Sequence, residues 1–457
     1  MQSIQKLRQS ILAGIEQPAA PGSWYQLRGA VTGGTIQTAL DRYGSVEVPD
    51  TGAPVALDRP LILASGRHLR AAPGQVFLQG RGCETCLVRN EHIQDGAYGV
   101  TDRALRDRDI SVEGGIWNIR TGQRCWTDPE KSMRGALGGL IFSGVERISL
   151  RNMEIFDSPL CGPRGTAASS YGLQLSDCRS FTVENIGFRN NSRDGVHING
   201  PAEYGLVRHI RGGKMGDDIV AVNAWDWDTS ALTFGTIENL VVEDVRGEVN
   251  EFRLHPGQKI FDSGVRLDCD IRSCVFENIR GIYTCKLYAQ PNITNAIRGT
   301  HDASGTVGRV GDVFFRDIRF LHVTGQGFGG APVRGLFEIC SDCRSLSFED
   351  IRVDSTLEAC DALDVKLLSI GPLSGTWKNG SENPADWGEI FNPDAVCRAD
   401  GLLLRDIRFA GVPATDASHL IRCVRMERNP LYPRTTPRGG SGYGSVGAVR
   451  LEGPAGK

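Results

Sequence analysis

The chain has 457 residues, and 54 Asp and Glu balance its 51 Lys and Arg, which gives a formal net charge of -3. A chain without excess positive charge releases few counterions from a phosphate backbone, so we expect no nucleic acid partner. The 57 Gly residues and an aromatic content of only 7% are untypical of a helical enzyme and predict many tight turns.

Signals for membrane association are missing from the sequence. No stretch approaches the roughly 20 consecutive apolar residues that span a bilayer. Residues 1–17 also lack the long apolar run of a secretory signal. We therefore expect no membrane partner and a cytoplasmic location, unless a signal has been removed from the chain.

The cysteines fit the same compartment. Their number, 13, is odd and their spacing irregular, which suits reduced, buried thiols better than a disulfide framework. The CxxC pairs Cys83/Cys86 and Cys340/Cys343 would form a zinc site only if the fold joined them, and a solenoid would keep them apart. We expect buried thiols here, and no cofactor or metal.

The N-terminal region differs from the rest of the chain. Residues 4–15, IQKLRQSILAGI, are amphipathic and predict a helix, within an N-terminal cap of residues 1–20, that covers the open end of a repeat fold. Residues 35–74 then predict a short helix, a strand, a turn and two further strands, as the first coils of residues 21–110.

A short motif recurs along the remaining chain. Each copy has a β-rich run of alternating apolar and polar residues, a polar pair ending in Asn or Asp, an Ile, Val or Met, and a second short run. The copies are ISLRNMEI (148–155), FTVENIGF (181–188), LVVEDVRG (240–247), CVFENIRG (274–281), VFFRDIRF (313–320), LSFEDIRV (346–353) and LLLRDIRF (402–409).

One such strand cannot bury its apolar face alone, whereas stacked copies bury it against one another. We therefore predict an all-β, right-handed parallel β-helix, with like residues in ladders along its axis. It would be a single domain over residues 1–457, with catalytic coils at 110–320 and C-terminal coils and insertions at 321–457.

Two neighbouring segments depart from the structural pattern: SRDGVHI at 192–198 and GDDIVAV at 216–222. If both lie on equivalent strands, Asp194 stacks against Asp217 and Asp218. Adjacent carboxylates repel one another, so stability alone does not explain them. They suit either acid and base catalysis of glycosidic bond hydrolysis or the binding of a hard cation such as calcium.

These motifs resemble glycoside hydrolase family 28, the polygalacturonases and their relatives. Members carry Asn-Thr-Asp-Gly followed by Gly-Asp-Asp, and Asp194-Gly195 and Gly216-Asp217-Asp218 match in order and near the family spacing. The resemblance implies hydrolysis with inversion, in which Asp217 is the acid while Asp194 and Asp218 activate water. An inverting acid and base stand about 6.5–9.5 Å apart. Residues 35–74 also resemble the opening coils of pectin-degrading β-helix enzymes.

The sequence departs from that family at two places. Its Gly-His-Gly coil is absent, and the nearest candidate, His255, comes later than expected. In residues 263–269, SGVRLDC, Asp268 stands where the family has a Lys, although Arg266 matches. Loss of that Lys weakens the case for a galacturonate carboxylate as the recognised group.

Candidate substrate-binding residues follow the Asp pair. Trp faces stack on sugar rings and carboxylates bind hydroxyls, and this stretch supplies Asn223, Trp225, Asp226 and Trp227. The alternative is that both Trp residues cover the end of a coil. His197 either faces the groove or satisfies a backbone group. As a group, Arg253, His255, Arg266 and Lys286 are plausible substrate contacts, whereas Tyr283 and Tyr288 more often pack between coils.

These features predict an inverting glycosidase that acts on a poly- or oligosaccharide. One alternative is a polysaccharide lyase, in which the carboxylates hold calcium and an Arg or Lys removes the proton beside a uronate carboxylate. Another is a carbohydrate-binding solenoid without catalytic activity. The hydrolase is favoured because an Asp-Gly strand and a separate Gly-Asp-Asp strand supply a base and an acid.

Overall fold

The computed structural model describes residues 4–80, 83, 86–93, 102–120, 138–157, 170–213, 215–226, 230–260, 265–288, 308–325, 333–371, 396–425 and 442–453. They belong to two compact units. The N-terminal unit comprises residues 5–222 and 227–248, and the C-terminal unit comprises residues 1–4, 223–226 and 249–457. In the described part of the chain, no helix has the length and apolarity needed to cross a membrane.

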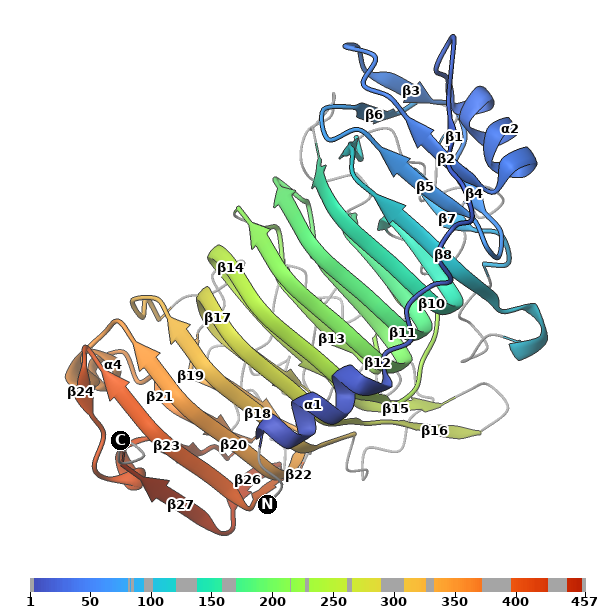
Figure 1. Cartoon of the computed structure of the whole chain (residues 1–457). Coiled ribbons are helices and arrows are strands. Elements are labelled where there is room, and N and C mark those ends of the chain that lie inside the picture. The colour runs from blue at the N-terminus through green and yellow to red at the C-terminus, as the bar shows by residue number, and fades with distance from the viewer. Residues whose placement is uncertain are drawn as a thin grey trace, which may run out of the picture. The chain divides into compact units, whose positions relative to one another are not determined.

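The N-terminal unit is a stack of parallel strands (Figure 1). β10, β11, β12 and β14 pair successively in parallel, and β14 continues into the C-terminal unit. The strands are β1 Tyr25–Gln26, β2 Ser45–Val48, β3 Val55–Leu57, β4 Leu61–Leu63, β5 His68–Ala71, β6 Val76–Gln79, β7 Val88–Asn90, β8 Asp107–Glu113, β9 Ile116–Asn118, β10 Gly138–Phe156, β11 Tyr171–Arg189, β12 Val196–Gly212, β13 Asp218–Asn223 and β14 Ile237–His255.

The C-terminal unit repeats this parallel arrangement. β17 pairs with β18, β18 with β20 and β20 with β23, while β15–β16 and β23–β24 are antiparallel. Its elements are β15 Gly257–Ile260, β16 Arg266–Cys269, β17 Ile271–Tyr288, β18 Arg309–Phe320, β19 Gly335–Cys340, β20 Asp342–Val353, α4 Leu357–Ala362, β21 Lys366–Ile370, β22 Val396–Asp400, β23 Leu402–Phe409, β24 Val412–Pro413, β25 Ile421–Cys423, β26 Tyr443–Val446 and β27 Val449–Glu452.

Both predicted N-terminal helices are present, but the second one does the capping. α1 (Ile4–Gly14) and the residues after it lie beside coils in the middle of the stack and not at its end. Arg8 donates to Glu243 of β14, and Gln17 donates to Thr182 of β11. α2 (Gly33–Tyr43) covers the first coils, and its Gln37 side chain both donates to and accepts from the backbone of Ile62 on β4. Periodicity predicts an apolar helix face, not the surface on which it packs.

The central Asn/Asp of each repeat takes the left-handed conformation that turns the chain between two runs. Its φ lies between +51° and +57°, a region that Asn, Asp and His tolerate better than other non-Gly residues. The residues are Asn152, Asn185, His209, Asp244, Asn278, Asp317, Asp350 and Asp406. His209 belongs to a copy that the sequence did not reveal, GLVRHIRG at 205–212, because His replaces the usual Asn or Asp.

The predicted ladders of like residues are present in the core. In the C-terminal unit, Phe276, Phe315 and Phe348 occupy one register on β17, β18 and β20. Their rings stack with centroids 5.2 and 5.3 Å apart and interplanar angles of 17° and 7°. Stacked aromatic rings on adjacent coils bury large apolar areas, so this ladder holds successive coils in register.

Candidate active site

The three predicted catalytic carboxylates lie together in the N-terminal unit. Asp194 precedes β12, Asp217 precedes β13, and Asp218 opens β13. Carboxylate oxygens of the three residues lie within 4.8 Å of one another. The segments that carry them are directly stacked, because the N–H of Gly195 donates to the carbonyl of Asp218 at 3.0 Å.

Two glycines allow this close stacking. A Cβ on Gly216 would stand 2.0 Å from the carbonyl oxygen of Ser192, and a Cβ on Gly195 would stand 2.6 Å from that of Ile219. Both distances are far inside van der Waals contact, so only Gly fits where one backbone approaches another. The Asp-Gly and Gly-Asp-Asp motifs thus combine a close backbone approach with the carboxylates beside it.

The three carboxylates differ in burial and contacts. Asp194 is 3% exposed, and its Oδ1 accepts the N–H of Asp218 at 3.1 Å while its Oδ2 lies 2.7 Å from His197 Nδ1. Asp218 is fully buried, including both carboxylate oxygens. Asp217 is half-buried and is the most accessible of the three, so it is best placed to reach a substrate.

One oxygen of each carboxylate lies closer to the others than the separation of about 6.5–9.5 Å expected between the carboxyl groups of an inverting acid and base. A water that donates to two carboxylate oxygens at about 2.7 Å each spans roughly 4.5 Å between them. Oxygens within 4.8 Å can therefore share one water. They can equally share a cation, because oxygen ligands of calcium surround it at about 2.3–2.6 Å.

His197 binds two side chains, and one of them is a candidate catalytic carboxylate. It is buried on β12 and bonds Asp194 through Nδ1 and the Asn199 side chain through Nε2, at 2.7 and 3.0 Å. The ring of Tyr171 stacks on it with centroids 3.8 Å apart. Sequence reasoning missed Asn199 and Tyr171. The former could have been found, because residues 197 and 199 lie on one face of a strand.

The prediction that Trp225 stacks on a sugar ring is wrong, because this side chain is buried. Trp225 lies in the C-terminal unit and is only 7% exposed. It packs edge-on against His255, which is fully buried, and its Cβ lies over the position that a side chain on Gly257 would need. Asn223 and Asp226 are also buried and bond each other at 3.1 Å. Trp225 therefore covers a coil, as the alternative proposed.

Lys286 pairs with a carboxylate that the sequence did not single out. Glu251 is 2% exposed and contacts the Lys286 ammonium and the Tyr283 hydroxyl, with Arg253 Nη2 at 3.7 Å. Burial alone would raise the pKa of Glu251, but the neighbouring charges of Lys286 and Arg253 hold it below its usual value. We therefore assign Lys286 and Tyr283 to this buried cluster, not to an open groove.

The remaining predicted contacts are placed differently. Arg266 is exposed on β16, where its backbone pairs with Ile260 of β15. Two residues further along β16, the Asp268 carboxylate accepts a hydrogen bond from the Gln258 side chain at 2.8 Å. Trp227 and the side chain of Tyr288 lie outside the described residues.

A second acidic cluster occurs in the N-terminal unit. Glu91, His92 and Asp107 bring ligand-type atoms within 4.8 Å of one another, but the His92 ring already bonds Asp107 at 3.0 Å. That hydrogen bond raises the pKa of His92. The stability that the pair contributes is full below pH 6.5 and is lost as the pH rises through the raised value.

We expect His92 and His68 to titrate on opposite sides of pH 6.5. His68 is 4% exposed, and burial lowers its pKa, with partial compensation from Asp109. Its contribution to stability has the opposite sign and falls as the pH drops below 6.5. Titration of the ring protons by NMR, assigned with His92→Gln and His68→Gln, would contradict this account if His68 titrated above His92.

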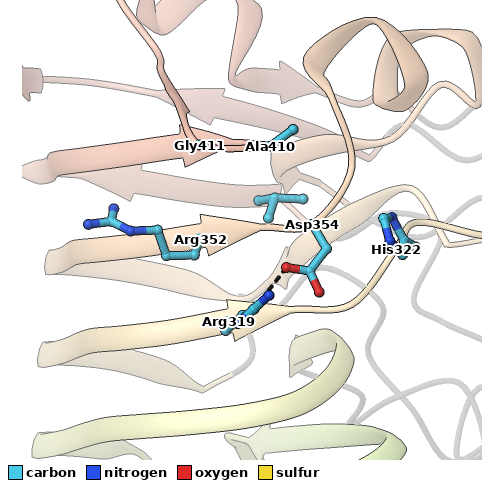
Figure 2. Close-up of a pocket in the computed structure, with 7 residues that line it drawn as sticks. Arg319, His322, Arg352, Asp354, Ala410 and Gly411 are labelled. Carbon is cyan, nitrogen blue, oxygen red and sulfur yellow. Dashed lines mark hydrogen bonds and ion pairs between the residues drawn. The ribbon is translucent and has the colours of Figure 1, made fainter.

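One pocket lies in the C-terminal unit, with a volume of about 530 Å³. Figure 2 shows Arg319 directed at Asp354, with His322 on the chain after β18 and Gly411 opposite. Arg319 donates to the Asp354 carboxylate at 2.8 Å, and Arg352 donates to the Asp406 carboxylate at 2.9 Å. Both arginines that line the pocket are thus paired with carboxylates of the protein. None of the predicted site residues lines this pocket.

Both CxxC pairs are buried, as predicted. Cys83 and Cys86 lie in the N-terminal unit, whereas Cys340 and Cys343 lie in the C-terminal unit, and none is more than 4% exposed. Burial raises the pKa of the Cys343 thiol to about 12. The Cys343 thiol is therefore protonated at neutral pH, and all four buried cysteines act as small apolar side chains.

Comparison with known proteins identifies the fold. No family model matches the sequence, and no curated protein is similar to it in sequence. The structure is similar to an exopolygalacturonase from Thermotoga maritima, with a TM-score of 0.53 and 11% identity over 98% of this chain and 96% of that one.

Two further solved structures are similar at lower scores. A polygalacturonase from Erwinia carotovora ssp. carotovora has a TM-score of 0.49 at 12% identity, over 85% of this chain and 94% of that one. A tailspike protein of E. coli bacteriophage HK620 has a TM-score of 0.47 at 11% identity, over 83% and 59%. At such low identity, it is the fold that the likeness to the Thermotoga protein shows: this chain is a right-handed parallel β-helix.

Proposed function

We propose that the protein is a glycoside hydrolase that cleaves a glycosidic bond in a poly- or oligosaccharide. The observation that carries this proposal is the proximity of three carboxylates from stacked coils, each with an oxygen within 4.8 Å of the others. Asp217 is the general acid that protonates the leaving oxygen, and Asp194 and Asp218 hold the attacking water. The likeness in fold to an exopolygalacturonase supports a carbohydrate as the substrate.

Burial favours inversion over a covalent intermediate. A nucleophilic carboxylate must let a sugar carbon approach one of its oxygens, yet Asp194 is 3% exposed and Asp218 is fully buried. A single water molecule held by these oxygens needs less room than a sugar ring, so their burial opposes a nucleophilic role more strongly than a water-holding one. Direct attack by water on the anomeric carbon, with Asp217 as the acid, inverts the configuration.

A calcium-dependent lyase is the second candidate, because the same oxygens could hold a cation. Screening a panel of plant and microbial glycans distinguishes the two. A hydrolase releases reducing ends without ultraviolet absorbance and keeps its activity in EDTA. A lyase would release an unsaturated, ultraviolet-absorbing product and lose activity until calcium is restored, and that result would overturn the proposal. Sugar binding without any product would support a non-catalytic solenoid.

A further inference from the structure

His197 stands in a buried chain of hydrogen bonds that leads to the candidate catalytic centre. Its Nδ1 lies 2.7 Å from Asp194 Oδ2, and its Nε2 lies 3.0 Å from Asn199 Nδ2. His197 and Asn199 are both fully buried. Neighbouring protein groups therefore determine which ring nitrogen of His197 carries a proton.

One backbone N–H group fixes which atoms donate and which accept throughout this series of hydrogen bonds. The N–H of Leu232 faces Asn199 Oδ1 at 3.3 Å, and a backbone N–H can only donate. The Ser176 hydroxyl also donates to this oxygen, at 3.0 Å. The other atom of the Asn199 amide is then the nitrogen, which can only donate to His197. His197 Nε2 must accept, so its one proton is on Nδ1 and is donated to Asp194.

The ring has little freedom to leave this arrangement. Tyr171, which is 2% exposed, stacks on His197 with an interplanar angle of 7°. Arg193 in turn donates to the Tyr171 hydroxyl at 3.2 Å and to Ser230 Oγ at 3.4 Å. A second proton on Nε2 would point at the N–H group of Asn199, so the site accommodates neutral His197.

We propose that His197 is a positioning residue that holds Asp194 as an ionised, oriented, water-activating base. Both Asp194 oxygens accept from N–H groups, Oδ1 from Asp218 and Oδ2 from His197. Neither oxygen has a place for a proton without losing a donor, so Asp194 is the base of the cluster and not its acid. This inference deepens the proposed function and rests on it for the catalytic role alone.

The tautomer is testable without any substrate. Long-range ¹H–¹⁵N correlation NMR of the full-length, ¹⁵N-histidine-labelled protein reads the proton on each ring nitrogen, and the signals lost in His197→Gln assign His197 among the 8 His. We expect a protonated Nδ1 and an unprotonated Nε2 at neutral pH. A proton on Nε2, in either the other tautomer or the imidazolium, would overturn the inference.

Two variants of neighbouring residues make this test sharper. Asn199→Asp replaces the donor at Nε2 by a carboxylate, so we expect His197 to become doubly protonated. Ser176→Ala removes one donor to Asn199 Oδ1 but leaves the Leu232 N–H, so we expect the wild-type tautomer. An unchanged tautomer in folded Asn199→Asp would show that the amide does not control the ring.

Turnover tests the positioning role separately. His197→Ala should lower kcat about 100-fold with little change in KM, because a misplaced catalytic group costs rate more than binding. His197→Asn keeps an N–H donor near the position of Nδ1 and should recover most of kcat. Equal loss in both folded variants would overturn the positioning role. No turnover by wild type on any glycan would overturn the proposed function and leave the NMR result standing.

Discussion

Replacing Asp217 by Asn is expected to lower kcat by about 10²–10⁴-fold, the usual contribution of a general acid. Asn has the same shape as Asp but cannot protonate a leaving oxygen. The substitution also removes one of three carboxylates whose oxygens lie within 4.8 Å, so it relieves repulsion and should not lower stability. Steady-state kinetics on a glycan that wild type cleaves, with a thermal melt of each protein, measures both effects.

Asp312→Asn is the matched control for this loss. Asp312 is exposed in the C-terminal unit with φ +51°, a conformation that Asn adopts as readily as Asp. It makes the same chemical change outside the cluster, so kcat should stay within twofold of wild type. Full activity of Asp217→Asn, or equal losses in both variants, would contradict the acid role of Asp217.

Gly216→Ala is expected to reduce the free energy of unfolding by about 3 kcal/mol or more, at the upper end of the usual cost of overpacking. Its Cβ would meet the backbone oxygen of Ser192 at 2.0 Å, and backbone cannot rotate away as a side chain can. Relief of this clash would push the two coils apart and move Asp217 and Asp218 away from Asp194. Urea denaturation and kcat should therefore both report the damage.

Gly187→Ala separates this effect from the loss of glycine itself. Gly187 lies in β11 of the same unit, and its added Cβ would meet only Glu154 Cγ, at an ordinary 3.6 Å. We expect a change within about 0.5 kcal/mol, because Ala fits a strand at least as well as Gly where space is open. If Gly216→Ala and Gly187→Ala had equal free energies of unfolding, the two coils at Gly216 and Ser192 would be able to move apart without loss of stability, which would contradict this account.

The fold was predictable because each repeat carries its own local signals. The alternation of apolar residues predicts strands, and the central Asn or Asp predicts the turn that the structure shows at Asn185 and Asp350. A local signal does not report long-range packing. The copy at 205–212 was missed because His209 stands at the turn position, and the packing surface of α1 is absent from its periodicity.

The proximity of the three carboxylates was predictable for a different reason, since equivalent positions on successive coils must stack. The depth of burial was not, because it depends on the whole coil. Trp225 reads as a sugar platform in sequence, yet it packs against His255, which lies 30 residues away in the chain. Likewise, the Leu232 N–H that orients Asn199 comes from a segment 33 residues later.

Cleavage in H₂¹⁸O tests the central claim most directly. If the carboxylates of Asp194 and Asp218 deliver water to the anomeric carbon, each cleavage places one ¹⁸O at C1 of the new reducing end. Mass spectrometry after immediate borohydride reduction detects this label, and we predict one ¹⁸O for each bond cleaved. Unsaturated fragments without ¹⁸O would show elimination instead, and would contradict the assignment of this centre as hydrolytic.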